Sequence, residues 1–376
     1  MVNDIHTIAA RVAAQFQPVQ DALIQRLEPY GSGNINDTFL VEVKSADRGS
    51  RFILQRINQS VFPRPKLIMV NLRAVFEHVA DKPDSSFDRL DRRWELPNIV
   101  TTVDGRDYLL DDEGEFWRAL TFIEDAKTYP KVKDSHHAGE AGYALGRFQR
   151  LINDLDTSRL HDTLPGFHIM PHYLDHYDEV VEKHDIDLSS PEVRYGVACV
   201  ARNRDWATVL QDALAAGRLQ ERPIHGDPKI DNIMIDNATG KAVSIIDLDT
   251  VKPGLVQYDI GDCLRSSCNP LGEETHEIDQ VAFDLDLCEA ILEGYFPQVR
   301  EFYTPEDEAY LYDSVRVLAF EMALRFFTDY LEGDVYFKTR YPEHNLMRAL
   351  VQFRLMESIE AQERQIGQII HALARA

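Results

Sequence analysis

The first third of the chain alternates apolar and polar positions, a pattern typical of half-buried strands. The alternating pattern occupies the end of the segment GSGNINDTFLVEV (31–43) and recurs in RFILQRI (51–57). Two further runs, Tyr108–Leu110 and Phe116–Ile123, flank the turn sequence DDEGE and indicate a hairpin. These runs predict a small antiparallel sheet.

Helical spacing of apolar residues dominates the rest of the chain. It marks five segments: one up to about Arg26, then Leu67–Ala80, Ser135–Leu155, Glu306–Glu332 and Pro342–Ala376. Gly142 and Gly146 in the third segment leave room for a close neighbour. We therefore expect an α+β protein with two lobes, a small sheet-containing lobe at 1–125 and a large helical lobe at 126–376.

A polar constellation lies in IHGDPKIDNIMIDNATGKAVSIIDLDTVKPGLVQYDIGD (224–262). A catalytic role explains these residues better than a role in packing. Two apolar runs around the turn DNATG predict a hairpin: Asn232–Ile235 and Ala242–Ile246. In an antiparallel hairpin, the start of the first strand lies beside the end of the second. We therefore expect Asn232 and Asp247 to meet at one end, with Asp227 just upstream.

Two carboxylates and an amide at one position are hard oxygen ligands suited to Mg²⁺. The order His225-Gly226-Asp227, Asn232, Asp247 also matches the catalytic loop and metal Asp of protein kinases. By that match, Asp227 takes the proton of the acceptor hydroxyl, while Asn232 and Asp247 hold the metal. Lys229 is expected to neutralise the moving phosphate, and Asp249 is a further candidate metal ligand.

The departures from protein kinases are equally informative. Leu248-Asp249 replaces Phe-Gly after the metal Asp, and the chain has no A-P-E signature, so no activation loop of the protein-kinase type is evident. The segment resembles the aminoglycoside phosphotransferase and choline kinase superfamily, small-molecule kinases that share the protein-kinase architecture. Within it, the chain most resembles the N-acetylhexosamine 1-kinases, through GSGNINDTFLVEV, LQRINQSVF, IDLDTVKPGLVQYDIGD and DYLEGDVYFKTRYPEHNLMRA.

The kinase arrangement implies an ATP site in the small lobe. A glycine loop lets the backbone approach phosphate, and an Arg on the following strand stands where protein kinases carry Lys. The candidate nucleotide contacts are Gly31, Gly33, Asn34, Asn36, Arg56 and the hinge residues Ile123 and Glu124. The plainer alternatives are a polar hairpin turn and an Arg that extends from a strand end to solvent. No Glu stands clearly opposite Arg56 in the helix 67–80, where Asn71 or Glu77 could occupy that face.

Composition restricts the partners. The 376 residues carry a formal net charge of −23, which argues against nucleic acid and anionic membranes because both are bound through excess Lys and Arg. No apolar run approaches membrane-spanning length, and the first residues, MVNDIHTIAARVAAQF, are too polar for a secretory signal. Four cysteines show no metal-binding or disulfide spacing. We therefore expect a cytoplasmic protein.

The resemblance implies ATP- and Mg²⁺-dependent transfer of the γ-phosphoryl group to a small molecule, with the anomeric hydroxyl of an N-acetylhexosamine as acceptor. Candidate substrate contacts are His168, His172, Arg265 and Arg340, although a structural role is the commoner fate of such residues. A choline, amino-alcohol or aminoglycoside kinase is the nearest alternative, since a cationic acceptor would suit an acidic chain. A catalytically inactive nucleotide-binding module is the alternative from another class.

Overall fold

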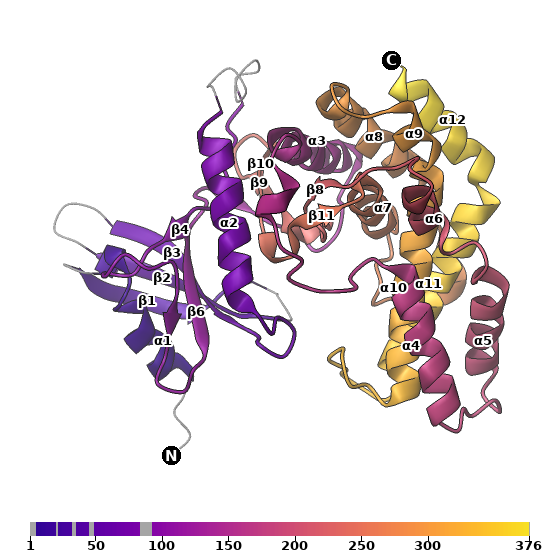
Figure 1. Cartoon of the computed structure of the whole chain (residues 1–376), viewed down its shortest axis with the longest axis horizontal. Coiled ribbons are helices and arrows are strands. Elements are labelled where there is room, and N and C mark those ends of the chain that lie inside the picture. Colours follow the sequence, from indigo (N-terminus) through magenta and orange to yellow (C-terminus); the bar gives the residue numbers. More distant parts are fainter. Residues whose placement is uncertain (1–4, 20–21, 32–34, 45–48, 83–91, 376) are drawn as a thin grey trace. The chain divides into compact units, whose positions relative to one another are not determined.

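The computed structural model describes residues 5–19, 22–31, 35–44, 49–82 and 92–375. The chain divides into two compact units (Figure 1). The first consists of Met1–Ala126, Leu155–Leu164 and Leu248–Lys252, and the second of Lys127–Asp154, Pro165–Asp247 and Pro253–Ala376. The sequence predicted one boundary, at 125/126, whereas the first unit also contains two short segments from later in the chain.

The first unit is built on an antiparallel sheet in the order β1-β2-β3-β6-β4, with β5 paired to β6. Its strands are β1 (Leu23–Pro29), β2 (Asp37–Lys44), β3 (Gly49–Ile57), β4 (Ile99–Val100), β5 (Leu109–Leu110) and β6 (Phe116–Thr121). The β5–β6 pairing confirms the predicted hairpin. The predicted small antiparallel sheet is thus present.

The expectation of one helix up to Arg26 is wrong. Helix α1 spans Ile5–Ala13, the turn η1 covers Gln17–Val19, and Leu23–Pro29 forms strand β1. Strand β1 pairs along β2, and Ile24 and Leu27 pack against the core beneath α1. Pairing with a neighbouring strand therefore overrides the local helical spacing.

Helix α2 (Pro65–Ala80) confirms the predicted helix and anchors the two later segments of the first unit. Asn71 on α2 is 1% exposed. Its amide donates 2.8 Å hydrogen bonds to the carbonyl oxygens of His161 and Val251, and its side-chain oxygen accepts from His161 N–H. Glu77 is exposed and pairs with Arg73. Asn71 thus lies on the buried face of α2 and bonds to the later segments, whereas Arg56 pairs with Asp37.

The second unit is mainly helical, as predicted. Its helices are α3 (Ser135–Ile152), α4 (Met170–Lys183), α5 (Pro191–Asn203), α6 (Val209–Ala215), α7 (Val256–Ser267), α8 (Leu285–Val299), α9 (Pro305–Ala309), α10 (Leu311–Glu332), α11 (His344–Ala361) and α12 (Glu363–Ala374). Each of the two long helices predicted at the C-terminal end is divided in two, at Tyr310 and at Gln362. Among the described residues, no helix combines the length and apolar content needed to cross a membrane.

Close packing of α3 on α8 confirms the role expected of the α3 glycines. A Cβ at Gly142 would overlap the backbone of Ile291, and one at Gly146 would lie 2.8 Å from Gln298 Cβ. Glycine is therefore required for the two helix backbones to approach each other.

Short strands position the polar constellation. Strand β8 (Arg222–Ile224) leads into it, and β9 (Ile233–Asp236) pairs antiparallel with β10 (Ala242–Ile245), as the sequence predicted. Two further short strands, β7 (Ala126–Lys127) and β11 (Lys252–Gly254), pair with β9 and β8 respectively. Short 3₁₀ turns cover Thr157–Arg159, Ile230–Asn232, Leu248–Thr250 and Ile278–Gln280.

Candidate functional site

The segment His225-Gly226-Asp227 follows β8 in a conformation that requires glycine, because Gly226 has a φ of +88°. Asp259 on α7 binds the backbone of this segment through its carboxylate. Its carboxylate accepts hydrogen bonds from His225 N–H at 2.9 Å, from Gly226 N–H at 2.8 Å and from the Gln149 amide at 2.9 Å. Asp259 therefore braces the loop.

His225 joins the loop to the hairpin. Its Nδ1 lies 3.2 Å from Asp227 N–H, which donates to it, and its Nε2 lies 3.0 Å from the carbonyl oxygen of Ile246. Burial lowers the pKa of His225, so the ring is neutral and carries its proton on Nε2. His225 thus has a structural role.

Asp227 lies between Asn232 and Lys229. The Asn232 amide donates to the Asp227 carbonyl at 2.8 Å and to its carboxylate at 3.3 Å, and Lys229 Nζ lies 3.2 Å from the same carboxylate oxygen. Lys229 therefore compensates the charge of Asp227. Because the Asn232 amide nitrogen is used in this way, its oxygen is the atom left to face a cation.

Asp247 follows β10 beside this group. The Ile246 N–H donates to the Asn232 carbonyl at 2.8 Å, so the hairpin brings the two positions together as predicted. Asp247 is exposed and has a φ of +65°, the left-handed region that few residues other than glycine adopt. The pKa of Lys229 is raised chiefly by Asp227, with Asp231 and Asp247 adding to the effect. Asp247 is therefore within electrostatic reach of Lys229.

The donor set fits Mg²⁺ better than a transition metal. Asn232 and Asp247 supply hard oxygens, and Mg²⁺ keeps several waters while it accepts oxygens from substrate phosphates. Within the described part of the chain, no group of three or more His, Cys, Asp or Glu side chains could hold a metal. A site made of one amide, one carboxylate, water and phosphate is consistent with that finding.

Asp249 belongs to the first unit and is engaged there by protein groups. Its Oδ1 lies 2.6 Å from Arg118 Nη2, and its Oδ2 accepts a 3.0 Å hydrogen bond from the Asn36 amide. Both Arg118 and Asp249 are almost completely buried. No sequence motif identified Arg118, which lies in β6 and also donates to Gln55 on β3.

The candidate nucleotide residues in the first unit have diverse partners. Gly31 has a φ of +78° with open space where a Cβ would stand, while Gly33 and Asn34 lie outside the described residues. Besides its contact with Asp249, Asn36 accepts from Asn58 N–H at 3.0 Å, and Arg56 pairs with Asp37 at 2.6 Å. Ile123 is buried, and the exposed Glu124 pairs with Arg51.

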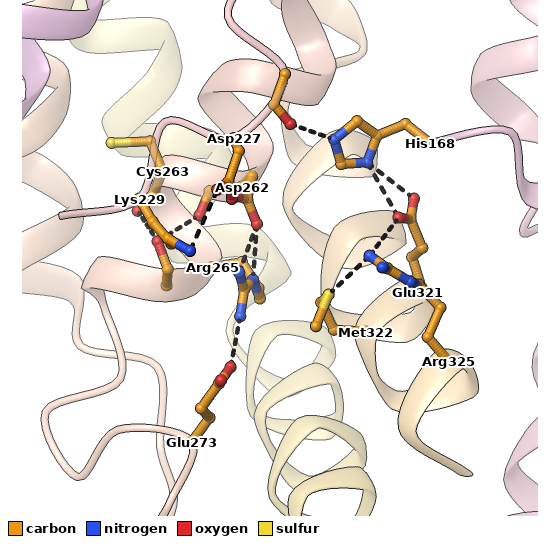
Figure 2. Close-up of polar contacts among 12 residues, drawn as sticks. His168, Asp227, Lys229, Asp262, Cys263, Arg265, Glu273, Glu321, Met322 and Arg325 are labelled. Carbon is orange, nitrogen blue, oxygen red and sulfur yellow. Dashed lines mark hydrogen bonds and ion pairs between the residues drawn. The ribbon is translucent and has the colours of Figure 1, made fainter. Parts of the chain in front are cut away.

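His168, a candidate substrate contact, is 2% exposed. Its Nε2 lies 2.7 Å from the Gly226 carbonyl oxygen, and its Nδ1 lies 3.0 and 3.2 Å from the two carboxylate oxygens of Glu321 on α10 (Figure 2). Glu321 also lies 3.7 Å from Arg325 Nη1. The sequence placed Glu321 and Arg325 only within a helix, and no motif identified them.

Arg325 is surrounded by aromatic rings. Its guanidinium carbon lies between 5.1 and 6.0 Å from the ring centres of Phe167, Tyr173, Tyr336 and Phe337. Burial opposes its charge, but nearby groups that include Glu321 and Asp227 raise the pKa of Arg325. Two aromatic segments on either side of the catalytic loop in the sequence therefore meet at one cation near Asp227.

The remaining substrate candidates differ in accessibility. Arg265 is buried and pairs with Asp262 at 2.5 Å and with Glu273 at 3.4 Å (Figure 2). Arg340 is 78% exposed, with Glu274 at 3.9 Å. His172 is exposed on the first turn of α4. The structure thus gathers Asp227, Lys229, Asn232 and Asp247 at one place and gives Arg265 a protein partner.

Similar structures have the same fold. They include a microcompartment-associated aminopropanol kinase (TM-score 0.64, 14% identity, 97% of this chain and 99% of that chain covered). A choline kinase from Cryptosporidium parvum (0.58, 13%, 99% and 99%) and an aminoglycoside phosphotransferase from Alicyclobacillus acidocaldarius (0.56, 14%, 95% and 96%) are also similar. At these identities, the likeness establishes the fold alone and supports the predicted kinase-like architecture.

A family model described as the phosphotransferase enzyme family matches residues 26–302, about three quarters of the chain. The matched range contains the Asp227 loop, the β9–β10 hairpin and Asp247. With these elements inside one match, the chain belongs to the phosphotransferase enzyme family and is an enzyme that phosphorylates a hydroxyl group of a small molecule.

Proposed function

We propose that the protein transfers the γ-phosphoryl group of Mg·ATP to the anomeric hydroxyl of an N-acetylhexosamine and forms the sugar 1-phosphate. The observation that carries the choice of acceptor is the charge balance around Asp227. A cationic acceptor such as choline needs carboxylates without basic partners, whereas a neutral sugar needs hydrogen-bonding groups and an apolar wall.

Each carboxylate labelled in Figure 2 has a basic partner. Asp227 pairs with Lys229, Asp262 and Glu273 share Arg265, and Glu321 contacts His168 and Arg325. Burial raises the pKa of Asp262, but Arg265 and then His168 and Lys229 lower it below its ordinary value. This balance supports a neutral acceptor, since a cationic acceptor would meet Lys229, Arg265 and Arg325, with which the carboxylates labelled in Figure 2 are already paired.

The aromatic residues around Arg325 supply the wall. Phe167 and Tyr173 come from one segment, and Tyr336 and Phe337 from the connection between α10 and α11. Asp329 fixes that connection, because its carboxylate accepts from the N–H groups of Tyr336 and Phe337 at 2.7 and 2.9 Å. A rigid arrangement of aromatic faces and hydroxyls suits a sugar ring with polar edges.

In the proposed reaction, Asp227 accepts the proton of the sugar hydroxyl as the hydroxyl oxygen attacks the γ-phosphorus, and the bond from the γ-phosphorus to the β–γ bridging oxygen breaks to release ADP. Lys229, 3.2 Å from Asp227, offsets the negative charge that moves between donor and acceptor. Asn232 and Asp247 would hold Mg²⁺, which neutralises the phosphate oxygens when it is bound. Because Arg118 and Asn36 engage Asp249, we assign that carboxylate to anchoring rather than to the metal.

The experiment that tests the proposal measures ADP release with Mg·ATP and a panel of N-acetylglucosamine, N-acetylgalactosamine, glucose, choline, ethanolamine and an aminoglycoside. We expect turnover with one or both acetamido sugars, and a product whose anomeric proton couples to phosphorus. Sites built on such hydrogen bonds can reject analogues that lack the groups by about 10⁴-fold. Phosphorylation at a primary hydroxyl, or a preference for choline, would overturn the choice of acceptor and leave the phosphotransferase activity intact.

An amino alcohol is the second candidate acceptor. The similar structures include an aminopropanol kinase and a choline kinase, and the chain carries a net charge of −23. The overall charge acts over long distances and is screened by salt, whereas the paired carboxylates lie beside Asp227. Local pairing therefore weighs more than net charge in our choice.

A further inference from the structure

Two imidazoles hold the peptide group between Gly226 and Asp227. His168 Nε2 lies 2.7 Å from the carbonyl oxygen of this peptide, and the N–H of the same peptide donates to His225 Nδ1 at 3.2 Å. A peptide group is planar, so contacts at its two opposite atoms fix its rotation. That plane carries the backbone nitrogen of Asp227 and sets the direction of its side chain.

External restraint is needed at this point of the chain. Gly226 has a φ of +88° and no side chain, so its backbone has more conformational freedom than any other residue type. Asp259 accepts from the Gly226 N–H but does not restrain the carbonyl on its other side. The described structure places His168 Nε2 on that carbonyl oxygen.

The surroundings of His168 require a hydrogen on Nε2. A carbonyl oxygen only accepts hydrogen bonds, so Nε2 must be the donor. Nδ1 faces the Glu321 carboxylate, which also lies 3.7 Å from Arg325 Nη1. The Tyr258 ring stacks on His168 at 5.3 Å, and Asp262 adds negative charge nearby. This setting favours an imidazole protonated on both nitrogens.

We propose that His168 is a positioning residue of the phosphotransfer reaction: through its Nε2–H···O=C bond to Gly226, it orients the peptide plane that aims the Asp227 carboxylate at the acceptor hydroxyl. The proposal rests on the proposed role of Asp227 as the base. It gives His168 a role in which the side chain acts through the catalytic loop and does not touch the substrate. Misplacement of a reacting group by about 1 Å can cost roughly 10²-fold in rate, so loss of this bond should reduce kcat.

Two substitutions separate the hydrogen bond from the fold. In His168→Gln, the amide nitrogen can reach the place of Nε2, whereas in His168→Asn the shorter side chain can reach only the place of Nδ1. The backbone conformation at this position favours Asn over Gln. His168 has a φ of +66°, and Asn tolerates the left-handed region better than Gln. We therefore expect Gln to preserve turnover and Asn to preserve stability.

The measurement is ADP release with Mg·ATP and N-acetylglucosamine, or with choline if the wild type phosphorylates choline and not the sugar. We expect kcat to fall about 10²-fold in His168→Asn and about fivefold or less in His168→Gln, with KM for ATP changed little in both. Thermal unfolding should show His168→Asn to be at least as stable as His168→Gln. If kcat follows stability, or if His168→Asn keeps the wild-type kcat, the proposal is wrong.

A spectroscopic test does not depend on the acceptor. Two-bond ¹H–¹⁵N NMR spectra of the wild-type protein, with His168 assigned by its absence in His168→Gln, should show a proton on Nε2. A neutral ring protonated only on Nδ1 would overturn the proposal. Asp227→Asn tests the proposed function separately from the role of His168. If Asp227→Asn keeps turnover, the assignment of Asp227 as the base is wrong. If Asp227→Asn is inactive while His168→Asn is fully active, only the positioning role of His168 is wrong.

Discussion

Asp249 and Arg118 form an ion pair with 2.6 Å between Oδ1 and Nη2, and both side chains are withdrawn from solvent. The pair joins the segment Leu248–Lys252 to strand β6 within the first unit. Asn36 donates to the other carboxylate oxygen of Asp249. Two carboxylates that are only two positions apart in the sequence, Asp247 and Asp249, therefore have different surroundings.

Asp249→Asn should destabilise the protein. Removal of one partner from a buried ion pair leaves the other charge uncompensated and costs about 3 kcal/mol or more. Chemical denaturation at neutral pH would measure this loss. Glu28→Gln is the control, since Glu28 pairs with Arg26 at the surface and its loss should cost about 1 kcal/mol or less. Equal effects of the two substitutions would contradict the anchoring role.

Asp247→Ala should abolish the dependence of nucleotide affinity on Mg²⁺. The carboxylate is exposed and near Lys229, and its removal takes the charged ligand from the proposed metal position. Calorimetric titration of ATP with and without Mg²⁺ measures the difference. Asp249→Asn, compared at a temperature where it is folded, should keep the wild-type dependence. If Mg²⁺ still strengthens ATP binding in Asp247→Ala, the ligand assignment fails.

Asp227→Asn should lower kcat by about 10²-fold or more, the usual scale for a lost general base. The substitution preserves the shape of the side chain that contacts Asn232 and Lys229. ATP affinity and thermal stability should therefore change little. ADP release and ATP titration on the same preparation measure both quantities, and near-wild-type turnover would exclude Asp227 as the base.

The stability of the wild type should fall as the pH rises above neutral. Burial lowers the pKa of His168, but the charge and hydrogen bond of Glu321, together with Asp262 and the Gly226 carbonyl, raise it above its ordinary value. A raised folded pKa means that this contribution is complete below the unfolded pKa of about 6.5 and is lost as pH rises through the folded pKa. Glu321→Gln should flatten that part of the profile. Urea denaturation between pH 6 and 9 compares the two proteins, and parallel profiles would refute the coupling.

Gly142→Ala should destabilise the helical unit, although alanine is the better helix former. The added methyl would overlap the Ile291 backbone on α8, and overpacking of this kind costs about 1–3 kcal/mol. Gly367→Ala on α12 is the matched control, because a Cβ there meets nothing within 4 Å. The control should be stabilised by about 1 kcal/mol or less through helix propensity. Thermal unfolding of both variants tests the contrast.

The sequence alone determined the features that depend on local order. Turn residues between two apolar runs predicted the β9–β10 hairpin, and antiparallel pairing then placed Asn232 beside Asp247, as the Ile246 hydrogen bond to Asn232 confirms. The spacing of Asp227, Asn232 and Asp247 indicated a kinase-like phosphotransferase, and the family match confirms that class. These inferences succeeded because the relevant residues lie close together in the chain.

Only the tertiary structure decided which distant groups meet. Leu23–Pro29 forms a strand because it pairs with β2, although the spacing of its apolar residues predicted a helix. Asp249 pairs with Arg118 from a strand more than a hundred residues earlier. His168 contacts Glu321 from a helix that comes after the catalytic loop in the sequence. Such pairs leave no local pattern, because an isolated Arg, Glu or His on a helix or strand looks the same whether it faces water or a buried partner. Burial and the competition for hydrogen-bond partners settle that choice, and both exist only once the chain has folded.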